Sequence, residues 1–259
     1  MRTLDFTYDL RLDFARPVHR HAFQLRCMPL ARDGQQVLRV RREVCPDVPV
    51  STDKDGFGNT VCFGLAEAPH EQFRVSVSGT VLLDTPCLPD TSLNAARFAV
   101  QTPFTQPGEA IRALYAAAPV KDSCMARALA LMHAVRAEIA YVPASTSIDT
   151  TAEQAAAQGC GVCQDHTQIL LSLLRMAGIP CRYAAGLLLG EGRTHAWAEA
   201  FIDGHWIGLD ATNGTVVHDT HIAIAVGRDH TDCDLNRGVM LGFGGQTQTV
   251  HVNVRDHCP

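Results

Sequence analysis

Residues 164–177 constrain the fold of this 259-residue chain more than any other segment. At helical spacing the segment is apolar nearly all round, with Ile169, Leu170, Leu171, Leu173, Leu174 and Met176. A helix that is apolar on every side is buried, because none of its faces can lie against water at low cost. Gly178 and Pro180 supply the expected end of the helix. The sequence therefore predicts a central helix that other elements cover.

The first part of the chain predicts a β domain. Residues 6–14 and 72–83 alternate apolar and polar side chains at period two, which is typical of half-buried strands. Pro86 and Pro89 end this strand pattern and indicate a boundary or linker. We therefore expect an all-β N-terminal domain at residues 1–95.

Helices come next, followed by an antiparallel sheet. Residues 123–139 place apolar side chains at three- and four-residue steps, which predicts a helix with one buried stripe. Three strand-like runs follow the central helix, at residues 181–189, 195–202 and 206–209. Asp203 and Gly204 form a dipeptide that favours a hairpin turn, and they lie between the last two runs. This region therefore predicts helices packed on antiparallel strands.

The last residues of the chain also have a strand pattern. Residues 239–254 alternate again, and the glycine-rich segment 242–245 predicts a hairpin turn within them. Strands followed by helices and then by strands indicate an α+β fold class and argue against repeated βαβ units. We expect residues 96–259 to form one core that ends in this β segment.

Charge and cysteine content exclude several functions. The formal net charge is -5, from 22 basic and 27 acidic residues, and no Lys/Arg-rich block occurs, so we expect no nucleic-acid partner. The longest apolar stretch is too short to cross a bilayer, and the N-terminus lacks the apolar core of a signal peptide. We therefore expect a cytoplasmic protein without a membrane partner. In a reducing cytosol most of the 10 cysteines stay free as small buried hydrophobes.

Cys163 is set apart from the other cysteines because it immediately precedes the central helix. Unpaired backbone N–H groups and the helix dipole at a helix start favour a thiolate over a thiol. The same N–H groups could hold an oxyanion during acyl transfer. On position alone, a cysteine that only packs at the helix start is an equally good interpretation.

His195 and Asp210 lie on the two strands of the predicted hairpin. If the hairpin closes at its Asp-Gly dipeptide, positions that sum to about 407 pair, so Asp210 comes within a diagonal step of His195. An imidazole beside a thiolate, with a carboxylate behind it, is the arrangement used for nucleophilic acyl transfer. We interpret Cys163, His195 and Asp210 as a catalytic triad. The alternative for His195 alone is a hydrogen-bonded residue of the core.

Cys160 and Cys163 also have the spacing of zinc and redox motifs. A zinc site needs two more ligands, and the sequence has no second CxxC or HxxxH pair. A redox pair has no use for a neighbouring His–Asp hairpin. We therefore expect neither a metal nor a cofactor.

Four blocks of the sequence together resemble the transglutaminase-like superfamily, and within it the bacterial branch of transglutaminase-like enzymes and cysteine proteases. The blocks are Gly161-Val-Cys-Gln-Asp-His166, residues 174–183, His195-Ala-Trp-Ala-Glu199 and Asp210-Ala-Thr-Asn213. The order Cys, His, Asp is specific, whereas each block alone is not. Residues 57–59 extend the resemblance to the N-terminal domain. Gln168 and Ala211 depart from the pattern, since many relatives carry His and Pro there.

This resemblance implies a papain-like core, with the nucleophile at the start of the central helix and the His and Asp on the sheet packed against it. It implies that Cys163 is the nucleophile, His195 the general base and acid, and Asp210 the orienting carboxylate. We expect an enzyme that cleaves amide bonds of a peptide or protein substrate through a thioester, as a protease or amidase. Protein-glutamine transamidation and an inactive binding module are the alternatives. Substrate identity, the second oxyanion donor and the oligomeric state stay open.

Overall fold

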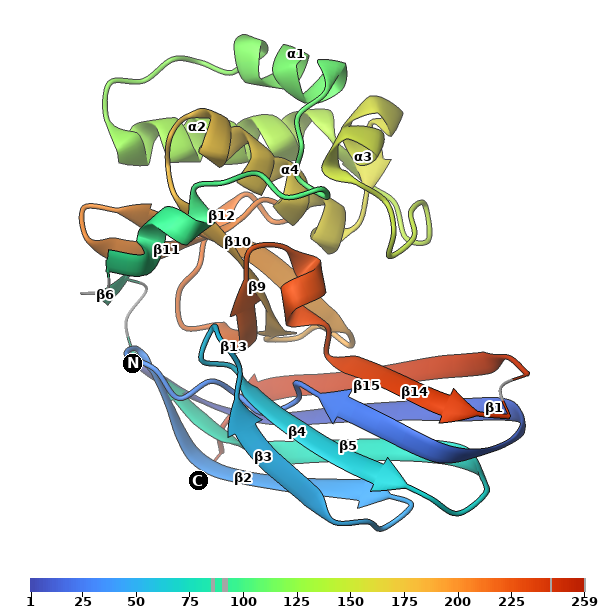
Figure 1. The fold of residues 1–259 in the computed structure, drawn as a ribbon. Helices are drawn as coiled ribbons and strands as arrows, with labels where there is room; N and C mark the ends of the chain where they lie inside the picture. The colour runs from blue at the N-terminus through green and yellow to red at the C-terminus, as the bar shows by residue number, and fades with distance from the viewer. Residues whose placement is uncertain (85–86, 90–92, 243, 259) are drawn as a thin grey trace.

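The central helix predicted from its apolar composition is α4 (Cys163–Met176). It lies among the other helices in the upper half of the computed structural model (Figure 1). The structure describes residues 1–84, 87–89, 93–242 and 244–258. All residues of α4 from Asp165 to Arg175 are buried, so the predicted central helix is confirmed.

One side of α4 packs on an antiparallel sheet. Its strands run in the order β12 (Thr215–Val216), β11 (His205–Asp210), β10 (Thr194–Ile202), β9 (Cys181–Leu188), β13 (His221–Gly227), with β6 (Cys87–Pro89) also paired to β11. Asp203 and Gly204 both have positive φ, 51° and 80°, as a tight hairpin turn between β10 and β11 requires. Ala198 pairs with Leu209, which confirms the predicted register.

Other elements cover the other side of α4: α1 (Glu109–Ala117), α2 (Cys124–Glu138), α3 (Ala152–Gln158), and the strand pair β7 (Ala140–Tyr141) and β8 (Cys160–Gly161). The 3-10 helices η1 (Leu93–Phe98) and η2 (His230–Cys233) lie against β9. The helix expected at residues 123–139 is α2. At α3 the capping box consists of Thr151 and Gln154. Glu153 instead accepts hydrogen bonds from the backbone N–H groups of Gly108, Ala110 and Ile111 at the start of α1. No helix in the described part of the chain is long and apolar enough to span a membrane.

The lower half of the molecule is a seven-stranded antiparallel sheet that is built around one long strand, β1 (Arg2–Leu25). The other strands are β2 (Gln35–Cys45), β3 (Val50–Lys54), β4 (Thr60–Ala66), β5 (His70–Leu83), β14 (Asn236–Leu241) and β15 (Gln246–Asp256). The first half of β1 pairs with β5 and β15, and its second half pairs with β4 and β14. Figure 1 shows these two halves of β1 in two layers.

The expected hairpin turn at 242–245 is wrong. β14 and β15 do not pair with each other; both run antiparallel to β1, one after the other. The glycines let the chain follow the bend of β1, where Gly242 and Gly245 have φ of 86° and 110°. The C-terminal segment is thus part of the same sheet as the first strand. The division of domains at residue 95 stays a prediction.

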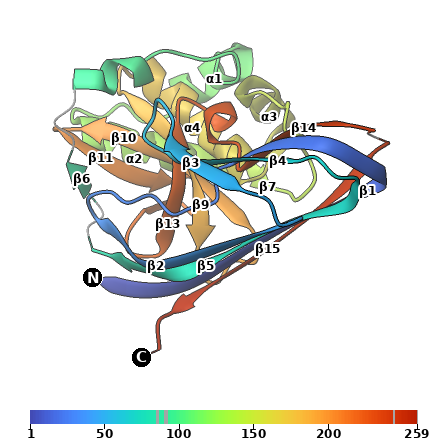
Figure 2. The same ribbon diagram turned by 60° about the horizontal axis from the view of Figure 1, so that its bottom comes forward.

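The two halves of the molecule share a core. Leu187, Ile222 and Ile224, from β9 and β13, pack in one apolar cluster with side chains of β1 such as Leu4 and Phe6. The sheet that carries β9 to β13 therefore has helices on one face and the β1 sheet on the other (Figures 1 and 2). Both ends of the chain lie on one side of the lower layer (Figure 2). This is the α+β architecture expected from the sequence.

A buried ion-pair cluster also joins the halves. The Glu199 carboxylate on β10 accepts hydrogen bonds from Arg182 on β9, at 2.7 Å, and from Arg32 in the segment between β1 and β2, at 2.8 Å. Burial opposes ionisation of Glu199, but the two guanidinium charges lower its pKa to about 2. Losing one partner of such a cluster leaves the other charges buried and uncompensated.

We predict that Glu199→Gln lowers the free energy of unfolding at pH 7 by about 3–5 kcal/mol. Because the folded-state pKa of about 2 lies below the unfolded value, the contribution is complete above about pH 4.5. It is lost as the pH falls through about 2. Urea unfolding of both proteins between pH 7 and pH 2 checks this. Glu43→Gln, which breaks an exposed ion pair with Arg41, is the matched control and should have little effect. An equally small effect of Glu199→Gln would contradict the prediction.

Candidate active site

Cys163 is the first residue of α4, so the helix begins one residue earlier than the sequence predicted. Its backbone N–H therefore has no acceptor within the helix. Asp165 stabilises this helix start, because its Oδ2 accepts hydrogen bonds from the Val162 N–H at 2.7 Å and the Thr146 hydroxyl at 2.6 Å. A Cβ at Gly161 would lie 2.6 Å from the Cβ of Asp165, so only glycine fits there. The requirement for this glycine comes from the helix start and not from the substrate side.

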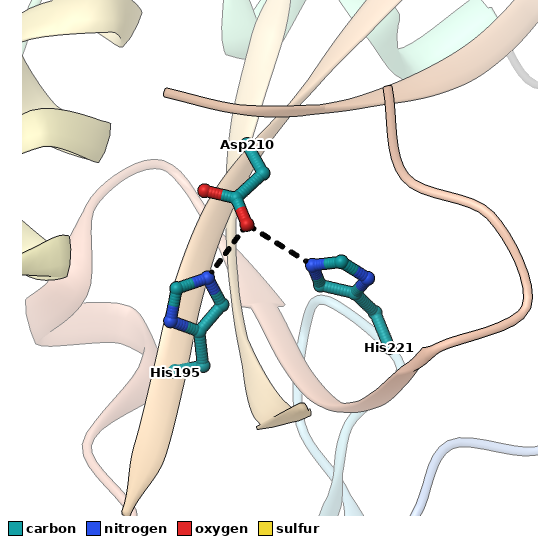
Figure 3. A group of neighbouring side chains, drawn as sticks. All are labelled: His195, Asp210 and His221. Atoms are coloured by element: carbon teal, nitrogen blue, oxygen red, sulfur yellow. Dashed lines mark hydrogen bonds and ion pairs between the residues drawn. The ribbon is translucent and has the colours of Figure 1, made fainter. Parts of the chain in front are cut away.

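His195 and Asp210 face each other across β10 and β11 (Figure 3). The His195 Nε2–H donates to Asp210 Oδ2 at 2.9 Å, and both side chains are buried. The other ring nitrogen, Nδ1, makes no bond to Asp210, and the neighbouring Cys163 raises the pKa of this imidazole. The structure thus brings together the three side chains that the sequence singled out.

Asp210 is held by five donors. Oδ1 accepts from the backbone N–H groups of Thr212 and Asn213, at 2.9 and 3.1 Å. Oδ2 accepts from His195, from the Asn213 side chain at 2.7 Å, and from the Nε2–H of His221 at 3.2 Å. Burial opposes its charge, but the bonds from His195 and His221 hold the pKa of Asp210 well below its usual range. The carboxylate is therefore ionised and fixed in orientation.

His221 is a residue that sequence reasoning missed. It begins β13, every residue of which is buried, and its Nδ1 accepts from the Thr220 hydroxyl at 2.9 Å. Figure 3 shows that its ring and the ring of His195 reach the same Asp210 oxygen from different directions. A histidine at the head of an otherwise apolar buried strand needs a polar partner. That was the signal in the sequence, but the partner is 11 residues away and its identity depends on the sheet order.

The environment of His195 favours the imidazolium. Burial by itself lowers the pKa of an imidazole, but the hydrogen bonds to Asp210 and Cys163 outweigh it and raise the pKa of His195 to about 10. The Glu191 carboxylate lies 3.4 Å from Nδ1 and adds a further negative charge. A cationic imidazole beside a sulfur stabilises a thiolate, which is the reactive form of cysteine.

A cleft of about 1070 Å³ opens beside these residues. Cys163 and His195 line it, together with Tyr141 and Ile148 from the helical layer and Val250 from the β1 sheet. Both halves of the molecule therefore build the cleft. Tyr141 and Ile148 are 47% and 58% exposed and form an apolar rim.

Ligand atoms of His195, Asp210 and His221 lie within 4.8 Å of one another, close enough to hold a metal ion. The same atoms already form the hydrogen bonds described above, so this group is satisfied as a hydrogen-bonded network. Cys160 and Cys163 are both free cysteines.

Three other residues near the site, Trp197, Glu199 and His166, are buried and packed within the structure. Trp197 is fully buried in the core, and Glu199 pairs with Arg182 of the neighbouring strand. His166 is buried and packs edge-on against Tyr141, with ring centroids 6.1 Å apart. Burial lowers the pKa of His166.

Comparison with known families identifies both halves of the chain. Residues 112–211 match the transglutaminase-like superfamily, and residues 4–82 match the bacterial transglutaminase-like N-terminal region. The first match contains Cys163, His195 and Asp210. The second covers most of β1 to β5.

Individual proteins are similar to this chain in fold or in sequence. A crystal structure from Cytophaga hutchinsonii described as a "putative cysteine protease" superposes with a TM-score of 0.84 at 22% identity, covering 100% of this chain and 91% of that one. An uncharacterised protein of Mycobacterium leprae is 36% identical over 129 residues, which are 46% of each chain. An uncharacterised protein of Mycobacterium tuberculosis is 27% identical over 226 residues, 73% of this chain and 72% of that protein. This chain thus matches about half the length of the first relative.

We predict that His195 stays protonated well above neutral pH. Because its folded-state pKa of about 10 exceeds the ordinary value of about 6.5, its charge stabilises the fold fully below about pH 6.5. The contribution is lost as the pH rises through about 10. NMR titration of the ring nitrogens measures this value directly. Asp210→Asn should bring it down toward about 6.5, whereas Asp203→Asn, in the exposed turn, should leave it unchanged. A neutral His195 at pH 7 in the unmodified protein would contradict the prediction.

Proposed function

We propose that this chain, which belongs to the transglutaminase-like superfamily, is a cysteine-nucleophile enzyme that hydrolyses amide bonds of peptides or proteins. The observation that carries the proposal is the position of His195, between Cys163 and the ionised Asp210 and at the edge of a cleft. The family and the fold support an enzyme of this kind. The choice of hydrolysis is ours.

In the first half of the reaction the Cys163 thiolate attacks the carbonyl carbon of the amide, and a C–S bond forms. The negative charge moves to the carbonyl oxygen, where the free N–H of Cys163 can donate to it. The His195 imidazolium then gives its proton to the amide nitrogen, and the C–N bond breaks. The amine leaves, and a thioester on Cys163 remains.

In the second half, His195 is neutral and takes a proton from water as the water oxygen attacks the thioester. The C–S bond breaks, and the acid product and the Cys163 thiolate–imidazolium pair result. Asp210 keeps the Nε2 side of His195 occupied, so that Nδ1 performs both proton transfers. The five donors to Asp210 prevent it from rotating during the cycle.

Transamidation is the second candidate, since it shares the thioester and differs in the group that resolves it. A transamidase must bring an amine to the thioester ahead of water, along a route lined by groups that exclude water. The aromatic side chains along the described part of this cleft are Tyr8, Tyr141 and Tyr183, and Tyr8 and Tyr183 are buried. One open cleft with a single exposed aromatic residue favours water as the acceptor. A binding module without activity would have no need for Cys163 next to the hydrogen-bonded His195 and Asp210.

Reactivity of Cys163 is the first test. We predict that brief iodoacetamide treatment near pH 6 modifies Cys163 roughly tenfold faster than the exposed Cys124 and Cys258. The reason is the cationic His195 beside its sulfur. Peptide mapping by mass spectrometry gives the rate at each cysteine. His195→Gln should abolish the preference, and His205→Gln, an exposed histidine of β11, is the control. Labelling in order of exposure would count against the nucleophile assignment.

The products distinguish hydrolysis from transamidation. We predict that unfolded casein yields new acid termini or free acids, and that Cys163→Ala lowers kcat by about 1000-fold or more. Cys160→Ala, three residues away, should keep most of the activity. The measurement is repeated with excess primary amine, and products are followed by mass. If more amine adduct than acid product forms at modest amine concentration, the enzyme is a cross-linking transamidase instead.

A further inference from the structure

β15 has one edge paired and one edge open toward the cleft. Its partner on one side is β1, in an unbroken register from Leu4–Asp256 to Phe14–Gln246. On the other side, the Val252 N–H donates to Gly192 O at 3.0 Å, and Val254 O accepts from the Gly190 N–H at 3.2 Å. In an antiparallel pair, alternate residues direct their backbone groups to opposite edges. Even-numbered residues of β15 therefore point their N–H and C=O groups away from β1.

The same alternation places the backbone groups of Gln248 and Val250 on that outer edge. Within residues 1–84, 87–89, 93–242 and 244–258, no hydrogen bond reaches these groups. Gln248 and Val250 both line the cleft that contains Cys163 and His195. An open strand edge is a template for pairing with another extended chain.

We propose that the open edge of β15, at Gln248 and Val250, binds the substrate as an added antiparallel or parallel strand. The substrate class is accordingly an unfolded, extended polypeptide segment. This inference rests on the proposed function, because it assigns that edge to the substrate of the Cys163 site.

The loop before β10 shows where the added strand would lie. Residues 190–192 already occupy the edge of β15 opposite Val252 and Val254, and the chain then leaves the edge to begin β10 and reach His195. At about 3.4 Å per residue, Val250 lies about 7 Å beyond the last position that the loop occupies. A peptide that pairs with Val250 and Gln248 would bind the same edge of β15 as residues 190–192, at the next positions along the strand. It would therefore lie beside the residues that lead into β10 and His195.

The side chains that line the cleft are consistent with a substrate that is recognised mainly through its own backbone N–H and C=O groups. Besides the Cys163–His195 pair, the cleft lining has two arginines, Arg136 and Arg193, and two carboxylates, Glu191 and Asp234. This balance gives no preference for a strongly charged substrate. The exposed rim at Ile148 can contact an apolar side chain of the peptide. Main-chain hydrogen bonds supply affinity in strand addition, and side-chain contacts supply selectivity.

Binding is tested apart from catalysis, with the Cys163→Ala protein and a fluorescein-labelled peptide of Leu, Val, Thr and Gln. Val250→Pro removes one outward N–H and leaves the hydrogen bonds to β1 in place, as proline on an open edge allows. We expect it to raise Kd about three- to tenfold. Gln246→Pro makes the same change on the same edge, but Gln246 is not part of the cleft lining, and Kd should stay within about twofold. Circular dichroism and thermal melting confirm that both variants fold.

A second measurement does not depend on any change at β15. Two isomers of the peptide carry N-methyl groups on alternate amides, one on the odd and one on the even positions. A strand that pairs with one edge uses only one of these sets, so one isomer should lose about tenfold or more in affinity and the other much less. Both isomers binding as tightly as the parent, with Val250→Pro unchanged, would overturn the inference. Absence of hydrolysis by the unmodified protein, with this binding pattern intact, would overturn the proposed function and leave the inference standing.

Discussion

The structure depends on keeping water away from every side of α4. The polar side chains of α4, such as Gln168, Ser172 and Arg175, are buried as well as its apolar ones, so the helix needs cover on every side. The sheet from β9 to β13 therefore covers one side and α1 to α3 the other (Figure 1). Cys163 lies, half buried, where the start of the helix reaches the surface. Burial of the helix thus decides which residue meets the cleft and supplies free N–H groups where a reacting carbonyl would lie.

The charge state of the site depends on Asp210, a buried carboxylate that His195 contacts. A buried carboxylate is costly unless donors surround it, and here they come from β10, β13 and the turn after β11. These donors hold the negative charge in one place, and that charge in turn keeps His195 cationic toward Cys163. The position of His195 therefore depends on the order of three strands. A change in the register of β10 against β11 by one residue would turn its ring to the opposite face of the sheet.

Structural features that depend on residues close together in the chain could be predicted from the sequence. The apolar run gave α4, and the Asp203-Gly204 turn fixed the register that brings Asp210 near His195. Features that join distant segments could not. The alternation in residues 239–254 indicates strands, but nothing in it indicates that their partner is β1. His221 likewise reaches Asp210 only because β13 lies beside β9, and Glu153 of α3 caps the start of α1, a different helix.

The pairing of β1 with β15 has a consequence for synthesis of the protein. Arg2 and Asp256 bond to each other although 254 residues separate them. At about 5–20 residues per second, the ribosome needs on the order of ten seconds or more between making the first strand and its partner. During that time one edge of β1 has nothing to pair with, and such an edge invites association with other nascent chains. The loop that leads to His195 rests on β15. This support for the cleft therefore forms only after β15 has been synthesised.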